Sequence, residues 1–265
     1  MDQKIPSEWK PNTVFTAHAL KGKKILLTGA SSGIGAATAV QLAACGASLI
    51  LVGRNEQKLS KVLSTLSTSN HEIYSVDLSK PDSLYSFIKA LPSHTLPLHG
   101  AFHSAGCELV KPARLTKASE IEEIITCSVG AGLSLARAIA SKGIMLNGGS
   151  LIFMSSVSAL AGTAGMSAYS ASKGAVDAMS RSLAAELAPR QIRVNTIISG
   201  AIKTPMHERL TNSMTLESVQ DYQNRHPLGF GDANDIAQVV AFLMSSGGRW
   251  ITGTSIVVDG GYLSV

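Results

Sequence analysis

Short apolar runs alternate with longer segments of helical periodicity along most of the chain. The runs are rich in leucine and β-branched residues, and they predict strands at 25–27, 49–52, 73–76, 101–102, 151–154, 194–198 and 256–258. The segments 36–45, 120–140 and 167–187 carry apolar residues at helical spacing. Strands this apolar must be covered on both faces, which parallel sheets with right-handed helical crossovers achieve. The alternation therefore predicts an α/β fold, a single Rossmann-type doubly wound domain of about seven parallel strands with helices on both faces.

Length and composition favour one domain. A chain of 265 residues with 45% hydrophobic residues can bury a large core, and no repeat, low-complexity tract or linker divides it. We expect an N-terminal extension over residues 1–20 and a single domain over 21–265. The first residues contain no apolar core of signal-peptide length, and no run reaches about 18 consecutive apolar residues. A cytoplasmic protein without a membrane partner is therefore expected.

Charge and cysteine usage exclude two classes of site. The net charge is +5, but only 15% of residues are charged and no Lys/Arg-rich run is present, so no nucleic-acid partner is expected. Cys45, Cys107 and Cys127 are far apart and form no CxxC or Cys/His cluster. This usage fits a reducing compartment and argues against a metal site.

A glycine-rich turn follows the first strand, where residues 28–35 read Thr-Gly-Ala-Ser-Ser-Gly-Ile-Gly before a helical segment. Glycine permits a tight turn and a close approach of backbone to a pyrophosphate, and the helix N-terminus offers free N–H groups. Ordinary loops are also rich in Gly and Ser, but the position between a strand and a helix favours a dinucleotide site. The expected cofactor contacts are Gly29, Ser31, Ser32, Gly33, Ile34 and Gly35.

The end of the second strand indicates which dinucleotide is bound. In NAD sites an acidic residue here accepts hydrogen bonds from the adenosine ribose, whereas this chain has Arg54 in Val-Gly-Arg-Asn. A guanidinium suits a 2′-phosphate, so NADP(H) is expected as the cofactor in preference to NAD(H). The alternative is an exposed arginine that opens the next helix. Asp77 and Leu78, after the third strand, are expected near the adenine, although Asp77 could instead cap a helix.

Three polar side chains can form a proton-transfer site. Tyr169 and Lys173 are four residues apart in a helical segment and project from one face. A nearby ammonium lowers the pKa of a phenol toward the working range, so Tyr169 can exchange a proton with a substrate oxygen. Ser156, after the fifth strand, can hold that oxygen. Each feature alone is also typical of a surface helix or a loop, and the combination with the phosphate turn carries the interpretation.

Together these motifs resemble the short-chain dehydrogenase/reductase family, from about Leu20 to the C-terminus. The resemblance extends to Arg193-Val194-Asn195, to Gly-Ala-Ile-Lys-Thr at 200–204, and to Thr252-Gly253 followed by Val-Asp-Gly-Gly at 258–261. The overall pattern is most similar to 3-oxoacyl-acyl-carrier-protein reductases.

The resemblance implies a role for each motif. It implies that Tyr169 is the general acid/base, that Lys173 lowers the pKa of Tyr169 and holds the nicotinamide ribose, and that Ser156 orients the substrate. It also implies cofactor contacts for Ser104, Ala105, Gly106, Ile202 and Thr204. Members usually assemble as tetramers or dimers, so a homotetramer or homodimer is expected.

The chain departs from the family pattern at three places. It reads His103-Ser104-Ala105-Gly106 where Asn-Asn-Ala-Gly is usual, and Ser199 stands where proline is common. Ser128 replaces the asparagine that holds a water in the proton relay to the lysine. A serine hydroxyl can hold a water or bond a backbone carbonyl, so we hypothesise a working but slower enzyme.

The substrate is left open by the sequence. Residues 205–226 occupy the segment that covers the substrate pocket in the family. Arg190 follows the Tyr/Lys helix at a place comparable to basic residues that dock an acidic acyl carrier, but the stretch 146–150 lacks a second basic group. We expect a small-molecule or acyl-carrier-borne carbonyl substrate. The alternatives are an NAD-dependent alcohol or sugar dehydrogenase and a dinucleotide-binding paralogue with little turnover.

Overall fold

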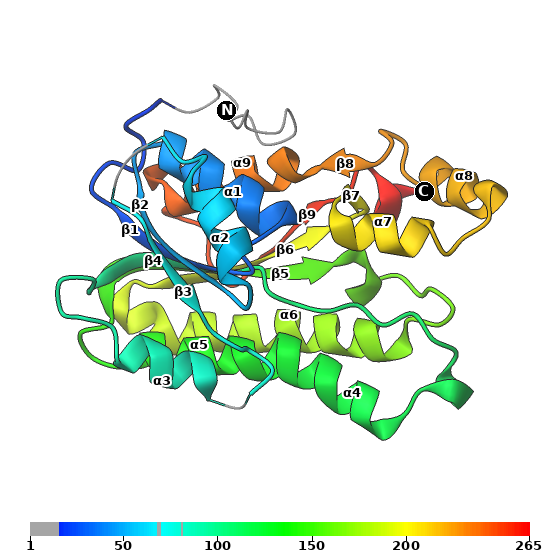
Figure 1. Cartoon of the computed structure of the whole chain (residues 1–265), viewed down its shortest axis with the longest axis horizontal. Helices are drawn as coiled ribbons and strands as arrows, with labels where there is room; N and C mark the ends of the chain where they lie inside the picture. Colours follow the sequence, from blue (N-terminus) through cyan, green and yellow to red (C-terminus); the bar gives the residue numbers. More distant parts are fainter. Residues whose placement is uncertain (1–15, 68–69, 81) are drawn as a thin grey trace.

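The computed structural model, which describes residues 16–67, 70–80 and 82–265, is built on a seven-stranded parallel sheet (Figure 1). The strand order is β3-β2-β1-β4-β5-β6-β9. The strands are β1 (Lys24–Thr28), β2 (Ser48–Gly53), β3 (Glu72–Ser75), β4 (Leu98–His103), β5 (Met145–Ser156), β6 (Arg193–Ser199) and β9 (Ser255–Val258). The order reverses between β1 and β4, which defines a doubly wound sheet and confirms the predicted fold class.

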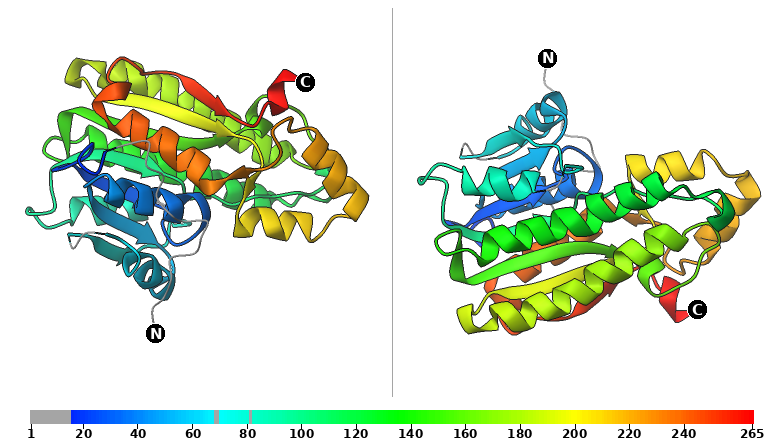
Figure 2. Two further views of the ribbon diagram at one scale, coloured as in Figure 1. Left: turned by 90° about the horizontal axis from the view of Figure 1, so that it is seen from above. Right: turned by 90° about the horizontal axis from the view of Figure 1, so that it is seen from below.

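Helices cover both faces of the sheet (Figures 1 and 2). One layer contains α1 (Gly33–Ala44), α2 (Glu56–Leu63) and α9 (Ala233–Met244), and the other contains α3 (Ser83–Lys89), α5 (Ala131–Ala140) and α6 (Ser167–Leu187). Successive strand residues supply opposite cores, because strand side chains alternate between faces. Leu27 and Leu51 pack toward α1, whereas Leu26 and Ile50 pack toward α5.

The helix expected over 120–140 is interrupted. Helix α4 (Ala118–Ile125) continues through a π-helical turn, Thr126–Gly130, into α5. Among the described residues, Ala118–Ala140 is the one helix long and apolar enough to cross a membrane by length and composition alone. Half of its most apolar window is buried inside the protein, and α5 packs against the sheet as a core helix. The sequence criterion of consecutive apolar residues missed it, because polar residues interrupt the run.

A small substructure stands beyond the carboxyl end of the sheet (Figure 1). It comprises the two-stranded pair β7 (Ile202–Lys203) and β8 (Gly231–Asp232), with α7 (Pro205–Thr211) and α8 (Leu216–Asn224) between them. The strand pair was not foreseen, because two residues are too few to give a periodic pattern.

The expected N-terminal extension is described only in part. Residues 1–15 lie outside the described residues. At the end of the segment, Leu20 is fully buried, and its N–H donates to the carbonyl oxygen of Cys45 at 2.8 Å.

Candidate active site

A cavity of about 780 Å³ opens at the carboxyl ends of the strands, around the point where the strand order reverses. Ligands bind at this position in doubly wound sheets. Fifteen of the predicted site residues line it: Gly29, Ser31, Ser32, Gly33, Ile34, Arg54, Leu78, Ser104, Ala105, Gly106, Ser156, Tyr169, Lys173, Ile202 and Thr204. Gly35, Asp77 and Ser128 are not part of its lining.

The glycine turn has no space for side chains at two positions. Gly29 has a φ of +68°, and a Cβ there would lie 2.7 Å from the backbone nitrogen of Ala105. A Cβ at Gly35 would overlap the carbonyl oxygen of Gly29. Gly35 thus lets α1 begin directly against the turn, which explains a glycine outside the cavity lining.

The N-terminus of α1 faces this cavity with its positive dipole end uncompensated. Within the described residues, the N-cap Ser32 makes no side-chain cap hydrogen bond, and the first turn contains no acidic side chain. Free N–H groups and the helix dipole at such an end favour an anion. The turn therefore fits a pyrophosphate.

Thr28 and His103 fasten the turn to the neighbouring strand. Thr28 Oγ1 lies 2.8 Å from His103 Nδ1 and accepts the N–H of Ala105 at 3.3 Å. His103 is 3% exposed, and burial lowers the pKa of its imidazole to about 3, with the Lys173 ammonium acting in the same direction. The ring is therefore neutral and links the end of β1 to the end of β4.

The far end of the cavity is basic. Arg54 and Lys58 are exposed side chains that line it next to Asn55, the residue that caps α2. Asp77 instead accepts hydrogen bonds from the N–H and Oγ of Ser79, at 3.1 and 2.7 Å, which lower the pKa of its carboxyl. Its role in the structure is the local turn, so its contact with the adenine stays a prediction.

Ser156, Tyr169 and Lys173 meet at the opposite end. Ser156 ends β5, and its Oγ accepts the N–H of Ser158 at 3.2 Å. Tyr169 and Lys173 lie one turn apart on α6, with Lys173 Nζ 5.6 Å from the centroid of the Tyr169 ring. Lys173 Nζ donates to the carbonyl oxygen of Met154 at 3.1 Å, which directs the ammonium to the end of β5.

The pKa of the phenol differs from the sequence expectation. Burial raises the pKa of Tyr169 to about 12, and the interaction with the Ser156 side chain opposes this rise only in part. Tyr169 is therefore protonated at neutral pH and is poised as an acid. Lys173 Nζ donates to the carbonyl oxygen of Met154, and burial lowers the pKa of Lys173 itself. Its lowering of the pKa of Tyr169 stays a prediction.

Ser128 lies directly behind the cavity wall. It sits in the π-helical turn, is 1% exposed, and its Oγ has no hydrogen-bond partner among the described residues. A Cβ on Gly106 would lie 3.6 Å from Lys173 Nζ and 3.9 Å from Ser128 Oγ. The absence of a side chain at Gly106 thus leaves space between the two polar atoms, as a water-mediated relay requires.

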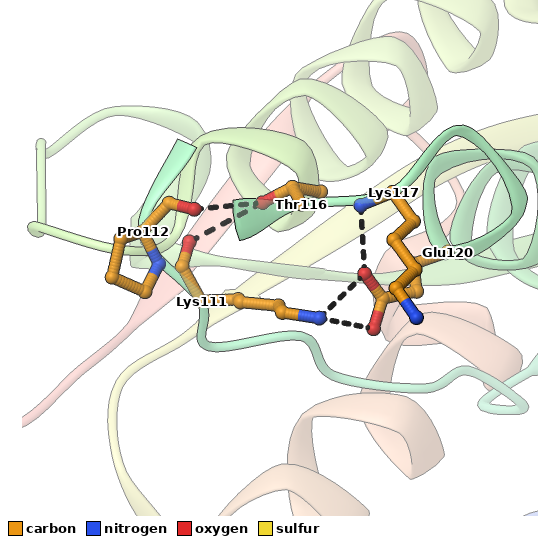
Figure 3. A network of polar contacts seen from close by, with 5 residues as sticks. All are labelled: Lys111, Pro112, Thr116, Lys117 and Glu120. Carbon is orange, nitrogen blue, oxygen red and sulfur yellow. Dashed lines mark hydrogen bonds and ion pairs between the residues drawn. The ribbon is translucent and has the colours of Figure 1, made fainter. Parts of the chain in front are cut away.

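The loop between β4 and α4 is held by a polar network that Figure 3 shows. Lys111 Nζ pairs with the carboxylate of Glu120 at 2.8 Å, and the same carboxylate accepts the N–H of Lys117 at 2.8 Å. The Lys111 N–H donates to the carbonyl oxygen of Gly165 at 2.7 Å. These contacts join the loop to the start of α4 and to the segment after β5, so two walls of the cavity are fixed to each other.

The end of the cavity covered by α7 and α8 is also lined by Glu108 and Tyr262, which sequence reasoning had not assigned. His207, Arg209, Tyr222 and Arg225, from the segment predicted to cover the pocket, line it as well. The segment 205–226, called the cover below, was predicted to cover the substrate pocket. Which of its side chains face the cavity depends on how α7 and α8 fold back, and only the tertiary structure shows this.

His226 anchors the end of this segment to the rest of the protein. Its Nε2 accepts the N–H of Ala201 at 3.1 Å, and its Nδ1 lies 3.0 Å from the carbonyl oxygen of Tyr222. Its ring packs within 5.4 Å of the ring of Phe230, measured between centroids. The residue is buried and has a structural role.

Comparisons with known proteins agree with this fold. Residues 29–263 match a family model described as enoyl-(acyl carrier protein) reductase. The chain is 35% identical over 247 residues to the 3-oxoacyl-acyl-carrier-protein reductase FabG of Rickettsia prowazekii, covering 93% of this chain and 99% of the relative. It is also 35% identical over 253 residues to a glucose 1-dehydrogenase of Gluconobacter oxydans, covering 91% of each.

A solved structure gives the same result. A short chain dehydrogenase from Burkholderia cenocepacia, in complex with NADP, superposes with a TM-score of 0.84 at 28% identity, covering 92% of this chain and 99% of the other. The chain belongs to the short-chain dehydrogenase/reductase family, a family of oxidoreductases that bind a nicotinamide dinucleotide. The resemblance identified from the sequence is confirmed.

Proposed function

We propose that this protein is an NADP(H)-dependent oxidoreductase that transfers a hydride between nicotinamide and a carbonyl or secondary alcohol. The observation that carries the proposal is one continuous cavity, which runs from Arg54, past the glycine turn, to Ser156, Tyr169 and Lys173. The groups that we assign to phosphate binding and to proton transfer therefore line a single cavity.

The residues present fit the cofactor. The uncapped N-terminus of α1 would hold the pyrophosphate, and Arg54 with Lys58 would hold a 2′-phosphate at the end of β2. Lys173 is assigned to the nicotinamide ribose, and Ile202 with Thr204 to the nicotinamide end. The bound dinucleotide supplies or accepts the hydride.

The protein's own groups manage the proton and the oxygen. Ser156 Oγ would donate a hydrogen bond to the substrate oxygen, and the protonated Tyr169 would deliver its proton there as negative charge develops. Lys173 would then return a proton to the phenolate through the space beside Gly106 and Ser128. In the oxidative direction the same groups move the proton outward.

A 3-oxoacyl thioester is our first candidate substrate, supported by the relatives named as 3-oxoacyl reductases. Arg190 no longer supports docking of an acyl carrier, because its guanidinium donates to the carbonyl oxygens of Ile139, Ala140 and Met145. It closes the C-terminal end of α5 instead. The proposal therefore concerns the 3-oxoacyl group as substrate and does not include docking of an acyl carrier on Arg190.

A sugar is the second candidate. Glu108, Arg209 and Arg225 give the substrate end hydrogen-bonding groups that a purely aliphatic chain would leave unused. One relative is named as a glucose 1-dehydrogenase. We further propose a cytoplasmic homotetramer or homodimer, as the family resemblance implies.

The test is a cofactor-consumption assay with both candidates. NADPH oxidation is followed with a short 3-oxoacyl thioester, and NADP⁺ reduction is followed with glucose, for wild type and Tyr169→Phe. We expect turnover with one substrate class and a loss of about 10² to 10⁴-fold in kcat for Tyr169→Phe. Equal turnover by the two proteins would contradict the assigned role of Tyr169.

A further inference from the structure

Two cysteines that are distant in sequence meet in the wall of the cofactor cavity. Cys107 follows Gly106 in the loop after β4, and Cys127 lies in the π-helical turn between α4 and α5. Both are half-buried free thiols, and both line the cavity. The segments that carry them meet here, because a Cβ on Gly106 would lie 3.9 Å from Ser128 Oγ, and the two thiols interact with each other.

The charges around the pair make the two thiols unequal. The hydrogen bond from Cys107 lowers the pKa of Cys127 to about 7, with Arg54 and Lys173 acting in the same direction and burial and Glu123 opposing it. The same hydrogen bond and burial raise the pKa of Cys107. The proton thus stays on Cys107, and Cys127 carries thiolate character near neutral pH, which is the form that reacts with oxidants.

We propose that Cys107 and Cys127 form a modification site for hydroperoxides, and that the disulfide they form closes the cavity to the dinucleotide. The second half rests on the proposed function, because it assumes that this cavity holds the cofactor.

The chemistry balances with the peroxide as oxidant. The Cys127 thiolate attacks one peroxide oxygen, so that an S–O bond forms, the O–O bond breaks, and the leaving oxygen takes a proton to become water or an alcohol. Cys107 then attacks the sulfur of the sulfenic acid, forming the S–S bond. The expelled hydroxide takes the Cys107 proton and leaves as water. Two thiols are oxidised, and one hydroperoxide is reduced.

The position of the pair explains why the bond would matter. Gly106, next to Cys107, lies close to both Lys173 Nζ and the Oγ of Ser128, the residue after Cys127. A bond between the loop and the π-helical turn would pull together the two segments that flank this space. The third cysteine, Cys45, is 1% exposed, burial raises the pKa of its thiol, and it lies outside the cavity lining. It is the matched control.

The full-length reduced protein is treated with hydrogen peroxide and measured by intact mass, thiol titration and peptide mapping without reduction. We expect the mass to fall by two hydrogens, a cross-link between the peptides of Cys107 and Cys127, and an NADPH affinity lowered by about tenfold or more. Dithiothreitol restores the affinity. Cys45→Ser behaves as wild type, Cys127→Ser forms no cross-link, and Cys107→Ser accumulates a sulfenic acid that dimedone traps.

Three results would overturn the proposal. They are oxidation of the wild type to separate sulfinic acids, trapping of a sulfenic acid on Cys107 at the wild-type rate in Cys127→Ser, and a cross-linked protein that binds NADPH as the reduced form does. A reduced protein that binds neither NADPH nor NADH would overturn the proposed function instead, while mass and thiol titration still decide whether the thiol pair reacts.

Discussion

The two ends of the cavity are built differently. Helix α1, which begins at the glycine turn, buries nine of its twelve residues against the sheet and α9. Helices α7 and α8, which cover the substrate end, bury none. Packing in the hydrophobic core therefore fixes the geometry of the cofactor end. The substrate end is held instead by helix N-caps, by His226 and by a group of aromatic rings.

This contrast separates the common chemistry from substrate choice. A site fixed by close packing holds its geometry, because interiors have little free volume. A weakly packed cover opens at low free-energy cost, and covers of this kind often control substrate entry and product release. We expect changes at the cofactor end to abolish binding and changes at the cover to adjust substrate preference.

The largest effect should come from pH, through the titration of Tyr169. Since burial holds the pKa of this phenol at about 12, the acid form needed for reduction is present throughout the neutral range. Oxidation needs the phenolate, so its kcat should rise about tenfold per pH unit, while reduction stays nearly flat from about pH 6 to about pH 9. Steady-state rates in both directions test this, and an oxidation profile that levels off near neutral pH would contradict a phenol pKa of about 12.

A substitution in the glycine turn should come next. In Gly35→Ala the added methyl group would overlap the carbonyl oxygen of Gly29, which is backbone and cannot rotate away. We expect the free energy of unfolding to fall by about 1–3 kcal/mol and dinucleotide binding to be lost. Gly174→Ala is the control, because its Cβ meets open space in α6 and alanine favours a helix by about 0.5–1 kcal/mol. Denaturant melts and cofactor titration measure both, and a Gly35→Ala protein equal to wild type would refute the packing argument.

A change in the cover should have a smaller and more selective effect. The Arg225 guanidinium lies 4.5 Å from the centroid of the Tyr262 ring, a contact worth about 0.5–1 kcal/mol at an exposed site. Arg225→Ala should raise the KM for substrate about two- to fivefold and leave the Kd for cofactor unchanged. Arg249→Ala, an exposed arginine outside the cavity lining, is the control. A change in cofactor Kd for Arg225→Ala would argue against independent ends.

The smallest effect is expected at Ser128. If its short side chain slows the proton relay, Ser128→Asn should raise kcat by less than about tenfold, and Ser128→Ala should lower it. Single-turnover rates at saturating cofactor separate this step from binding. A Ser128→Asn protein that turns over no faster would show that this position does not limit the rate.

Most of the scaffold could be predicted, because it depends on local pattern. The seven apolar runs became the seven strands of the sheet, and the segment 167–187 matches α6 residue for residue. The glycine turn was found because its geometry needs glycine at fixed places. The π-helical turn Thr126–Gly130 was not, since nothing in the apolar spacing distinguishes it from an α-helix.

What the sequence could not give depends on distance and burial. A spacing of four places Tyr169 and Lys173 on one helix face, but the depth of burial sets the pKa of the phenol. Cys107 and Cys127 look unrelated in sequence and become neighbours only when the β4 loop meets the π-helical turn. Arg190 has the charge of a docking residue, yet its position over the end of α5 gives it a structural role.

The most direct test of the proposed NADP(H) preference is a titration of wild type and Arg54→Ala with NADPH and NADH, followed by nicotinamide fluorescence. We expect the wild type to bind NADPH more tightly than NADH and Arg54→Ala to lose that preference while still binding NADH. Binding of NADH equal to or tighter than that of NADPH in the wild type would contradict the phosphate assignment.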